Sequence, residues 1–323
     1  MRLAGDRVLL IGRAGMDFYP DPPGTRTEHG ATWISALGGS AANTAVQIVK
    51  LGGRADIVTC VSDDAVGRYA VNELACYGVG HGHVRAVGGE ARTSLAIVET
   101  TIEDHQSVIY RNGAADFEMT EADVAAVPYG DFDALITAGT VFAAEPSRGA
   151  AFHALKLARD VGLPRIFDID YRPYSWPSPQ VASDVLSRAG AMCEIVVGND
   201  EEFGFMAGGY DLGLDKARSL VAEGAKVVIY KMGPEGSITI TPEGETRTGI
   251  WRVDALKPTG AGDSFMGGFA MALAQGRRLA EAVSRGSACA AITVTRPTCS
   301  KALPDAGELE RFMAGHPGPT IEE

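Results

Sequence analysis

A glycine-rich stretch in the last quarter of the chain places a carboxylate beside an expected helix. The segment Lys257–Phe265 reads Lys-Pro-Thr-Gly-Ala-Gly-Asp-Ser-Phe, and its two glycines permit a tight turn before Asp263. Beyond the turn, apolar side chains recur every fourth residue, at Phe265, Phe269 and Leu273. This period predicts a helix with one apolar face that begins close to Asp263.

The expected helix start could carry out acid–base chemistry on a phosphorylated ligand. The first N–H groups of a helix lack intrahelical partners and carry partial positive charge, so a phosphoryl group could bind there. Asp263 could then accept the proton of an attacking hydroxyl. The backbone groups that would hold the developing charge belong to Gly260, Ala261 and Gly262. An ordinary glycine turn before a core helix remains the structural alternative.

Two motifs in the first fifty residues could bind hydroxyl groups. Gly38 and Gly39 would let a ligand approach the backbone closely, and Asn43 offers both donors and an acceptor. Asp17 follows the first expected strand and could accept two hydroxyls. The alternatives are a helix start with small residues for packing, and a solvated aspartate in a loop.

A third motif combines carboxylates with an arginine. In an extended strand, Asp168, Asp170 and Arg172 would lie on one side. The carboxylates could hold hydroxyls or magnesium-bound water, and Arg172 could bind an anion. Together with Arg111 it could read one carboxylate of a substrate. A salt bridge between Arg172 and its neighbouring aspartate is the alternative.

Strands and helices are expected to alternate along most of the chain. Short apolar runs predict strands at Arg7–Ile11, Ala55–Val61, Ala134–Ala138, Arg165–Asp170, Ile195–Gly198 and Lys226–Tyr230. Amphipathic segments predict helices at Thr44–Leu51, Val66–Tyr77, Ser147–Val161 and Leu212–Glu223. Hairpins are expected at Leu95–Thr100 with Gln106–Arg111, and at Gly236–Thr241. This order predicts an α/β fold with a mostly parallel sheet and helices on both faces.

The polar motifs fall where the expected strands end, which is where open α/β sheets bind ligands. Two β-rich segments, at about 14–36 and 90–112, do not fit the alternating order. We expect them to form a small sheet over one end of a single domain that spans residues 1–315. Residues 316–323 are expected to form a C-terminal tail.

Composition excludes several classes of protein. The chain has 323 residues, a net charge of −12 and a pI near 5.0, which argues against nucleic acid or an anionic membrane as a partner. No signal-like or membrane-spanning apolar run is present. The five cysteines are scattered and odd in number, which indicates reduced thiols and a cytoplasmic protein.

The glycine-rich stretch before Asp263, the Gly38-Gly39 motif and the run from Asn199 to Glu202 together resemble the ribokinase-like (PfkB) carbohydrate kinases. The resemblance implies a three-layer sandwich with a small β-sheet lid. It also implies that Asp263 is the catalytic base, while Asp17, the two glycines and Asn43 contact a sugar. Because exposed small sheets often pair across a two-fold axis, we also expect a homodimer formed through the lid.

The same resemblance implies ATP as co-substrate and Mg²⁺ as cofactor. Glu202 would act on magnesium indirectly, through water, and Lys231 would assist phosphoryl transfer. The residues expected at the nucleotide are Asn199, Glu202, Lys231, Gly233, Gly236 and Ser287. The Asn199–Glu202 run is equally typical of a helix N-cap. Lys257 stands where many relatives have an aspartate that helps bind a monovalent cation, so its ammonium is expected to replace that cation.

Four stretches together indicate the class of substrate. The chain resembles the family members that phosphorylate 5-dehydro-2-deoxygluconate in inositol catabolism at Gly12–Pro20, Asp168–Pro173 with Trp176, Gly198–Glu202 and the tail Thr295–Pro304. Kinases of 2-keto-3-deoxygluconate share part of this pattern and are the alternative. Both substrates are keto-deoxy sugar acids, which suits Arg111 and Arg172 as carboxylate readers. Another sugar or nucleoside kinase, or a sugar-acid sensor without catalysis, stays open.

Overall fold

A computed structural model describes residues 2–322. Its strands are β1 (Arg7–Ile11), β2 (Gly15–Asp21), β3 (Thr32–Gly38), β4 (Arg54–Ser62), β5 (Gly80–Val87), β6 (Leu95–Val98), β7 (Ser107–Tyr110), β8 (Ala134–Ala138), β9 (Arg165–Asp168), β10 (Ile195–Asn199), β11 (Val227–Lys231), β12 (Ser237–Thr241), β13 (Gly244–Thr248) and β14 (Ile321–Glu322). Its α-helices are α1 (Ser40–Lys50), α2 (Ala65–Cys76), α3 (Glu121–Ala125), α4 (Ser147–Asp160), α5 (Pro179–Gly190), α6 (Asp200–Ala207), α7 (Gly213–Ala222), α8 (Ala261–Ala274), α9 (Leu279–Val294) and α10 (Ala306–Gly315).

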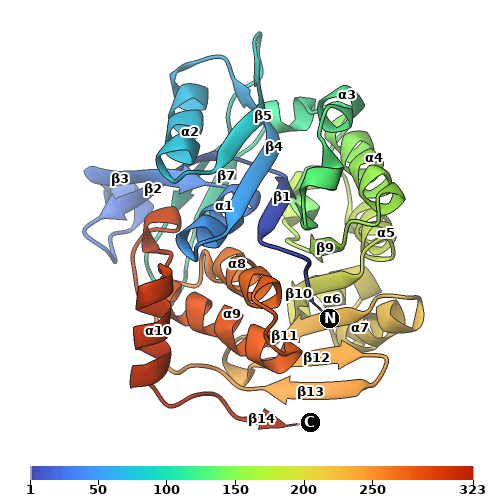
Figure 1. The fold of residues 1–323 in the computed structure, drawn as a ribbon. Coiled ribbons are helices and arrows are strands. Elements are labelled where there is room, and N and C mark those ends of the chain that lie inside the picture. Colours follow the sequence, from blue (N-terminus) through green and yellow to red (C-terminus); the bar gives the residue numbers. More distant parts are fainter. Residues whose placement is uncertain (1, 323) are drawn as a thin grey trace.

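The central sheet confirms the expected α/β architecture. Its strand order is β14-β13-β12-β11-β10-β9-β8-β1-β4-β5, and the pairs from β11 to β5 are all parallel (Figure 1). β12, β13 and β14 extend it as antiparallel strands. Parallel strands are covered on both faces, which is why they read as continuous apolar runs.

Alternate residues of β1 show the three layers. Val8 and Leu10 belong to the core shared with α1, α8 and α9, whereas Leu9 and Ile11 belong to the core shared with α4 and α5. Figure 1 shows the first group of helices on one side of the sheet and α3 to α7 on the other. The strand period of two therefore divides one apolar run between two cores.

A separate four-stranded sheet, which we call the lid, has the order β3-β2-β6-β7. Its strands lie in the β-rich segments that interrupt the alternating order, and β6 with β7 is the expected hairpin. The strand β5 was not predicted from the sequence, because it is a polar, half-exposed edge strand with two glycines.

One expected strand ends earlier than its sequence indicates. β9 stops at Asp168, and Asp170 adopts a left-handed backbone with φ of 36°. The expected alternation of Asp168, Asp170 and Arg172 along one strand is therefore wrong. The turn instead brings Asp170 and Arg172 into direct contact, with Arg172 Nη2 2.7 Å from Asp170 Oδ1.

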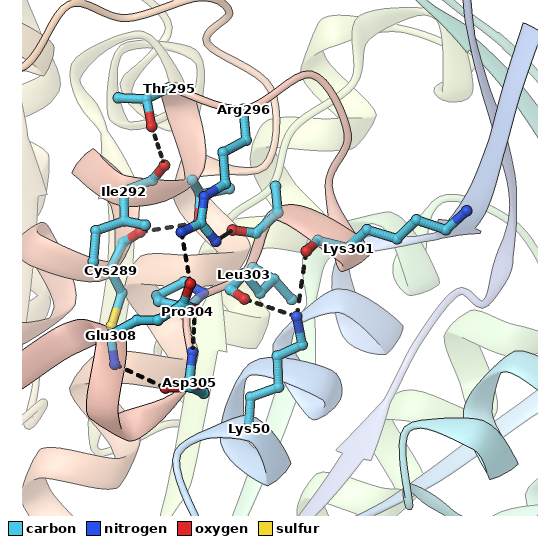
Figure 2. A network of polar contacts seen from close by, with 12 residues as sticks. Lys50, Cys289, Ile292, Thr295, Arg296, Lys301, Leu303, Pro304, Asp305 and Glu308 are labelled. Carbon is cyan, nitrogen blue, oxygen red and sulfur yellow. Dashed lines mark hydrogen bonds and ion pairs between the residues drawn. The ribbon is translucent and has the colours of Figure 1, made fainter.

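The segment after α9 joins the lid to the main body. Lys50, at the end of α1, donates to the carbonyls of Ser300, Lys301 and Leu303 at 3.2, 3.4 and 2.7 Å (Figure 2). Arg296 fixes the same segment to α10 through Glu308 at 2.9 Å. From this anchored segment, Lys301 Nζ reaches the carbonyl of Ser35 in the lid at 2.8 Å.

No helix in the described part of the chain has both the length and the apolar character needed to cross a membrane.

Candidate active site

A cavity of about 870 Å³ lies between the lid, the ends of the central strands and the start of α8. It brings together nearly all the residues expected to be functional: Asp17, Gly39, Asn43, Arg111, Asp170, Arg172, Asn199, Glu202, Lys231, Gly233, Gly236, Gly260, Ala261, Gly262, Asp263 and Ser287. Segments more than 240 residues apart in sequence meet in this one space.

Gly38 is the expected site residue that does not line the cavity. A Cβ placed there would lie 1.8 Å from Asp17 Oδ1. Its function in this structure is to make room for that carboxylate, because any larger residue would displace it. Gly39 does line the cavity, with a φ of 101° at the N-terminal end of α1.

Asp263 occupies the first turn of α8, as the glycine-rich stretch predicts. The turn starts at Gly260, whose φ of 85° is favourable for glycine, and Ser264 N–H makes the first bond back to Gly260 O at 3.1 Å. The N–H groups of Gly262 and Asp263 precede that bond. N–H groups at a helix start carry partial positive charge, so these two suit an anionic ligand beside the carboxylate.

The environment of Asp263 gives it the acidity of a base that works near neutral pH. Burial raises the pKa of Asp263 to about 6, and the nearby charge of Asp170 acts in the same direction. The amide of Asn43, which donates to Asp263 Oδ2 at 2.8 Å, and the positive charge of Arg172 lower it. A general base is most effective when its pKa lies close to the operating pH.

One face of α1 holds the first turn of α8 in place. Thr44 Oγ1 donates to the carbonyl of Asp263 at 3.4 Å. One turn later, Gln47 Oε1 accepts from Ser264 Oγ at 3.0 Å, and Thr293 Oγ1 donates to the same serine at 2.8 Å. Residues three and four apart share a helix face, so Asn43 and Gln47 act on adjacent residues of α8.

Two cavity-lining residues, Asp17 and Asn43, each have a buried oxygen without a protein donor. Asp17 Oδ2 accepts from Tyr19 Oη at 3.3 Å, whereas Asp17 Oδ1 and Asn43 Oδ1 have no hydrogen-bond partner among the described residues. Burial raises the pKa of Asp17, and Arg13 opposes that shift. Buried polar atoms are nearly always satisfied, so these oxygens are suited to ligand hydroxyls.

The two arginines expected to read a carboxylate are both engaged with protein groups. Arg172 pairs with Asp170, the alternative that the sequence left open, and lies 3.9 Å from Glu202. Arg111 pairs with Asp116, donates to the carbonyl of Thr140 at 3.0 Å and stacks over Phe117.

Asp170 is itself fixed by hydroxyl donors. Its Oδ2 accepts from Ser40 Oγ at 2.7 Å and from Thr140 Oγ1 at 3.2 Å. Ser40 begins α1, so this bond ties the end of β9 to the helix that also positions Asp263. Ser40 and Thr140 were not anticipated, because small hydroxyl residues carry no distinctive sequence signal.

At the opposite end, Asn199 and Glu202 form a helix cap. Asn199 Oδ1 accepts from Glu202 N–H, and Glu202 Oε2 accepts from Asn199 N–H, both at 2.8 Å. The other oxygen of Glu202 remains near Arg172 and the cavity. The capping interpretation therefore holds, and Glu202 also lines the cavity, where its Oε1 accepts from Tyr171 N–H at 3.3 Å.

A positive charge lies beside the start of α8. A Cβ built on Gly262 would lie 3.8 Å from Lys231 Nζ, and this ammonium also lies 5.4 Å from the ring centre of Phe265. Burial raises the pKa values of Asp168 and Glu202, and the charge of Lys231 lowers both. The positive charge of Lys231 is therefore close both to these carboxylates and to the first turn of α8.

The carboxylates do not form a metal site by themselves. Across residues 2–322, no three His, Cys, Asp or Glu side chains are grouped so that they could hold an ion. Asp168 and Glu202 both face the cavity and are buried. They fit Mg²⁺ that is bound mainly by phosphate and water, the arrangement that this ion prefers.

Comparisons with known proteins find relatives over almost the whole chain. The model of the pfkB family carbohydrate kinases matches residues 6–306. Among curated proteins, the chain is 36% identical to 5-dehydro-2-deoxygluconokinase of Photobacterium profundum over 312 residues, covering 95% of this chain and 94% of that protein. It is 32% identical to the protein of the same name from Geobacillus kaustophilus, with 95% and 93% covered.

Solved structures show the same fold. A fructokinase from Vibrio cholerae, in a form with fructose, ADP and potassium ion bound, superposes with a TM-score of 0.84 at 26% identity, covering 97% of this chain and 99% of that one. Aminoimidazole riboside kinase from Salmonella enterica, complexed with aminoimidazole riboside and an ATP analog, gives 0.82 at 25% identity, with 95% and 99% covered.

Proposed function

The chain belongs to the pfkB family of carbohydrate kinases, and we propose that it transfers the γ-phosphoryl group of ATP to the terminal hydroxyl of 5-dehydro-2-deoxygluconate. ATP-dependent sugar phosphorylation is the activity of the family. The observation that supports it best is Asp263, a partly buried carboxyl with a pKa of about 6 in the N-terminal turn of α8.

In the proposed reaction, Asp263 accepts the proton of the attacking hydroxyl. The N–H groups of the turn Gly260–Gly262 and of Asp263 stabilise the charge on the transferred group, and the ammonium of Lys231, which lies beside Gly262, assists. Asn43 holds the base with Nδ2, while its free Oδ1 and that of Asp17 accept substrate hydroxyls.

We assign the nucleotide to the end of the cavity formed by β10, β11 and α9. Asn199, Glu202, Lys231, Gly233, Gly236 and Ser287 line this end. Bound Mg²⁺ would neutralise phosphate charge, and Glu202 would orient its water ligands. Ser287 lies on α9 among Ala290, Ala291 and Val294, a surface suited to an apolar base.

The substrate assignment is supported by the curated relatives, which match 95% of the chain. A keto-deoxy sugar acid has a terminal hydroxyl for the base and secondary hydroxyls for Asp17 and Asn43. It also carries an anionic group, which an acidic protein must bind through local positive charge. The cavity supplies that charge through three arginines.

We further propose a homodimer formed through the lid. β7 is an edge strand of the lid sheet, and Val108 and Tyr110 on its outer face are 45% and 58% exposed. Ser107 and Ile109 alternate with them and line the cavity. An edge strand with exposed apolar residues is a ready surface for pairing with a second copy.

We place the enzyme in the cytoplasm. All five cysteines, Cys60, Cys76, Cys193, Cys289 and Cys299, are unpaired in the described structure. Proteins with free, mostly buried thiols are typical of reducing compartments, where ATP is also available.

A coupled assay of ADP release tests the proposed function. The panel is 5-dehydro-2-deoxygluconate, 2-keto-3-deoxygluconate, fructose, ribose and adenosine, each with Mg-ATP. We expect strong preference for 5-dehydro-2-deoxygluconate. Preference for 2-keto-3-deoxygluconate would keep the sugar-acid class and change the substrate. Preference for a neutral sugar or nucleoside would overturn the sugar-acid assignment, and no activity with any of them would favour a non-catalytic sensor.

A further inference from the structure

Three guanidinium groups line the lid end of the cavity: Arg13, Arg111 and Arg172. Their positive charges act on one shared neighbour, the phenol of Tyr174. Each of them lowers the pKa of Tyr174, which burial raises, so all three lie within electrostatic range of that phenol. An anionic substrate would bind to the arginine whose hydrogen-bond donors are not already used by protein carboxylates.

Arg172 and Arg111 are already paired with protein carboxylates. Arg172 donates to Asp170 and to the carbonyl of Tyr171 at 2.9 Å. Arg111 holds Asp116, and both side chains are at most 5% exposed. Removing Arg111 from that pair to bind a ligand would leave a buried carboxylate uncompensated, which is strongly unfavourable.

Arg13 is different, because no carboxylate lies within hydrogen-bond distance of it among the described residues. It follows β1, is 7% exposed and donates through Nη1 to the neutral Ser94 Oγ at 2.9 Å. The nearest carboxylate oxygen, Asp17 Oδ1, is 3.9 Å from Nη2. A buried guanidinium with so little compensation is expected to have a further anionic partner.

The backbone fixes Arg13 against the helix that positions the base. Ala42 N–H donates to the carbonyl of Arg13 at 3.3 Å. A Cβ on Gly39 would lie 2.3 Å from the same carbonyl, so the close approach requires glycine there. Arg13 is therefore held at the N-terminal end of α1, the helix from which Asn43 contacts Asp263.

We propose that Arg13 binds the carboxylate of the substrate and selects sugar acids over neutral sugars. The order of groups along the cavity matches such a molecule. Arg13 lies beside Asp17, whose free oxygen suits a secondary hydroxyl, and Asn43 leads to Asp263 and the terminal hydroxyl. This assignment rests on the proposed function, and it replaces Arg111 and Arg172 as carboxylate readers.

Arginine suits this role better than lysine. Its planar fork can donate two parallel bonds to one carboxylate, which adds geometric selection to charge attraction. Binding the substrate would also complete the charge compensation of a buried cation. Two variants separate the charge attraction from the two-bond geometry. Arg13→Met loses both, whereas Arg13→Lys keeps the charge and loses the planar fork.

The test compares two substrates in each enzyme: 5-dehydro-2-deoxygluconate and its neutral analogue with a hydroxymethyl group in place of the carboxylate. For Arg13→Met we expect the ratio of kcat/KM for acid over analogue to fall about 10²-fold, mainly through KM. Arg13→Lys should fall between this variant and wild type. Thermal melts confirm that each variant is folded.

The matched control is Arg148→Met, which removes a partly buried guanidinium that bonds the carbonyls of Phe142 and Ala143 outside the cavity. Its acid-to-analogue ratio should equal that of wild type. An unchanged ratio in folded Arg13→Lys and Arg13→Met would overturn the inference, as would an acid-specific loss in Arg172→Met alone. Failure of the wild type to use any sugar acid would instead overturn the proposed function.

Discussion

Asn43 Nδ2 donates to Asp263 Oδ2 at 2.8 Å and so joins two residues that are 220 positions apart in the chain. The bond links the first helix of the main body to the first turn of α8. The bond also opposes the effect of burial on the pKa of Asp263, because burial raises this pKa and the bond lowers it. The acidity of Asp263, the proposed base, is therefore set jointly by its own surroundings and by α1.

The pH dependence of the reaction should show this coupling. Asp263 acts as a base only when deprotonated, and its pKa is raised to about 6. We expect kcat/KM to fall as the pH drops below about 6 and to be level above it. Asn43→Leu removes a bond that favours the charged form, so its acid limb should move to higher pH.

Thr44→Val is the control for that shift. Thr44 contacts the carbonyl of Asp263 and not its carboxylate, so its loss should leave the midpoint of the acid limb in place. The measurement is kcat/KM for the sugar from pH 4.5 to 8 in all three enzymes. A kcat/KM that is still level at pH 5 in the wild type would contradict the assignment of Asp263 as the titrating base.

Removing the base should affect turnover far more than binding. Asp263→Asn keeps the shape of the side chain and cannot accept the proton, so kcat should fall about 10²–10⁴-fold. The dissociation constant of the sugar, measured by calorimetry, should stay within about threefold of wild type, since a hydrogen-bonding group of the same size remains. Turnover close to that of wild type would refute the catalytic role.

The sequence predicted the parts of this site that depend on local pattern. The turn before α8, the strand ends and the β-rich lid segments all carry short-range signals, and the central parallel sheet is confirmed. The sequence could not show that Arg111 pairs with Asp116, or that Asp170 turns out of the strand into a left-handed conformation. Such partners are set by tertiary packing.

The importance of Arg13 could not be predicted from the sequence either, because its surroundings are also set by tertiary packing. It lies four residues before Asp17 in the loop after β1, and the sequence analysis selected Asp17 and not Arg13. A charged residue two positions after a buried strand is a weak signal, because most such residues are solvated. Its burial and its incomplete pairing with Asp17 become visible only when β6 and the lid are in place.

Turnover should not depend on potassium. Lys257 is fully buried, and its Nζ donates to the carbonyl of Thr259 and lies 4.0 Å from Cys299 Sγ. Burial lowers its pKa, and the charges of Asp263 and Asp17 oppose that shift. We expect this ammonium to supply the positive charge that a bound monovalent cation would otherwise give.

The measurement is kcat in 100 mM potassium chloride against the same ionic strength of tetramethylammonium chloride. Equal values support the replacement, and a strong potassium requirement would contradict it.

Disrupting the outer face of the lid should abolish dimers. Val108→Glu with Tyr110→Glu places two like charges on the exposed side of β7, where pairing with a second copy would bury them. We expect the mass measured by light scattering to fall from about twice 33.8 kDa to 33.8 kDa. Leu212→Glu, at a 52% exposed site away from the lid, should leave the dimer intact. A wild-type mass of 33.8 kDa would contradict the proposed homodimer.

Loosening the lid should uncouple ATP consumption from sugar phosphorylation. His105, in the loop between β6 and β7, lies with Nε2 3.0 Å from Thr259 Oγ1 in the loop before α8. The contact closes the lid over the end of the cavity where the base lies, and such closure excludes water from phosphoryl transfer.

In His105→Ala we expect more ADP per sugar phosphate and a higher KM for the sugar. Thr259→Val, which removes the other partner, should give the same change. His81→Ala, on the edge strand β5, should match wild type; a ratio of one ADP per sugar phosphate in both lid variants would show that the contact does not control water entry.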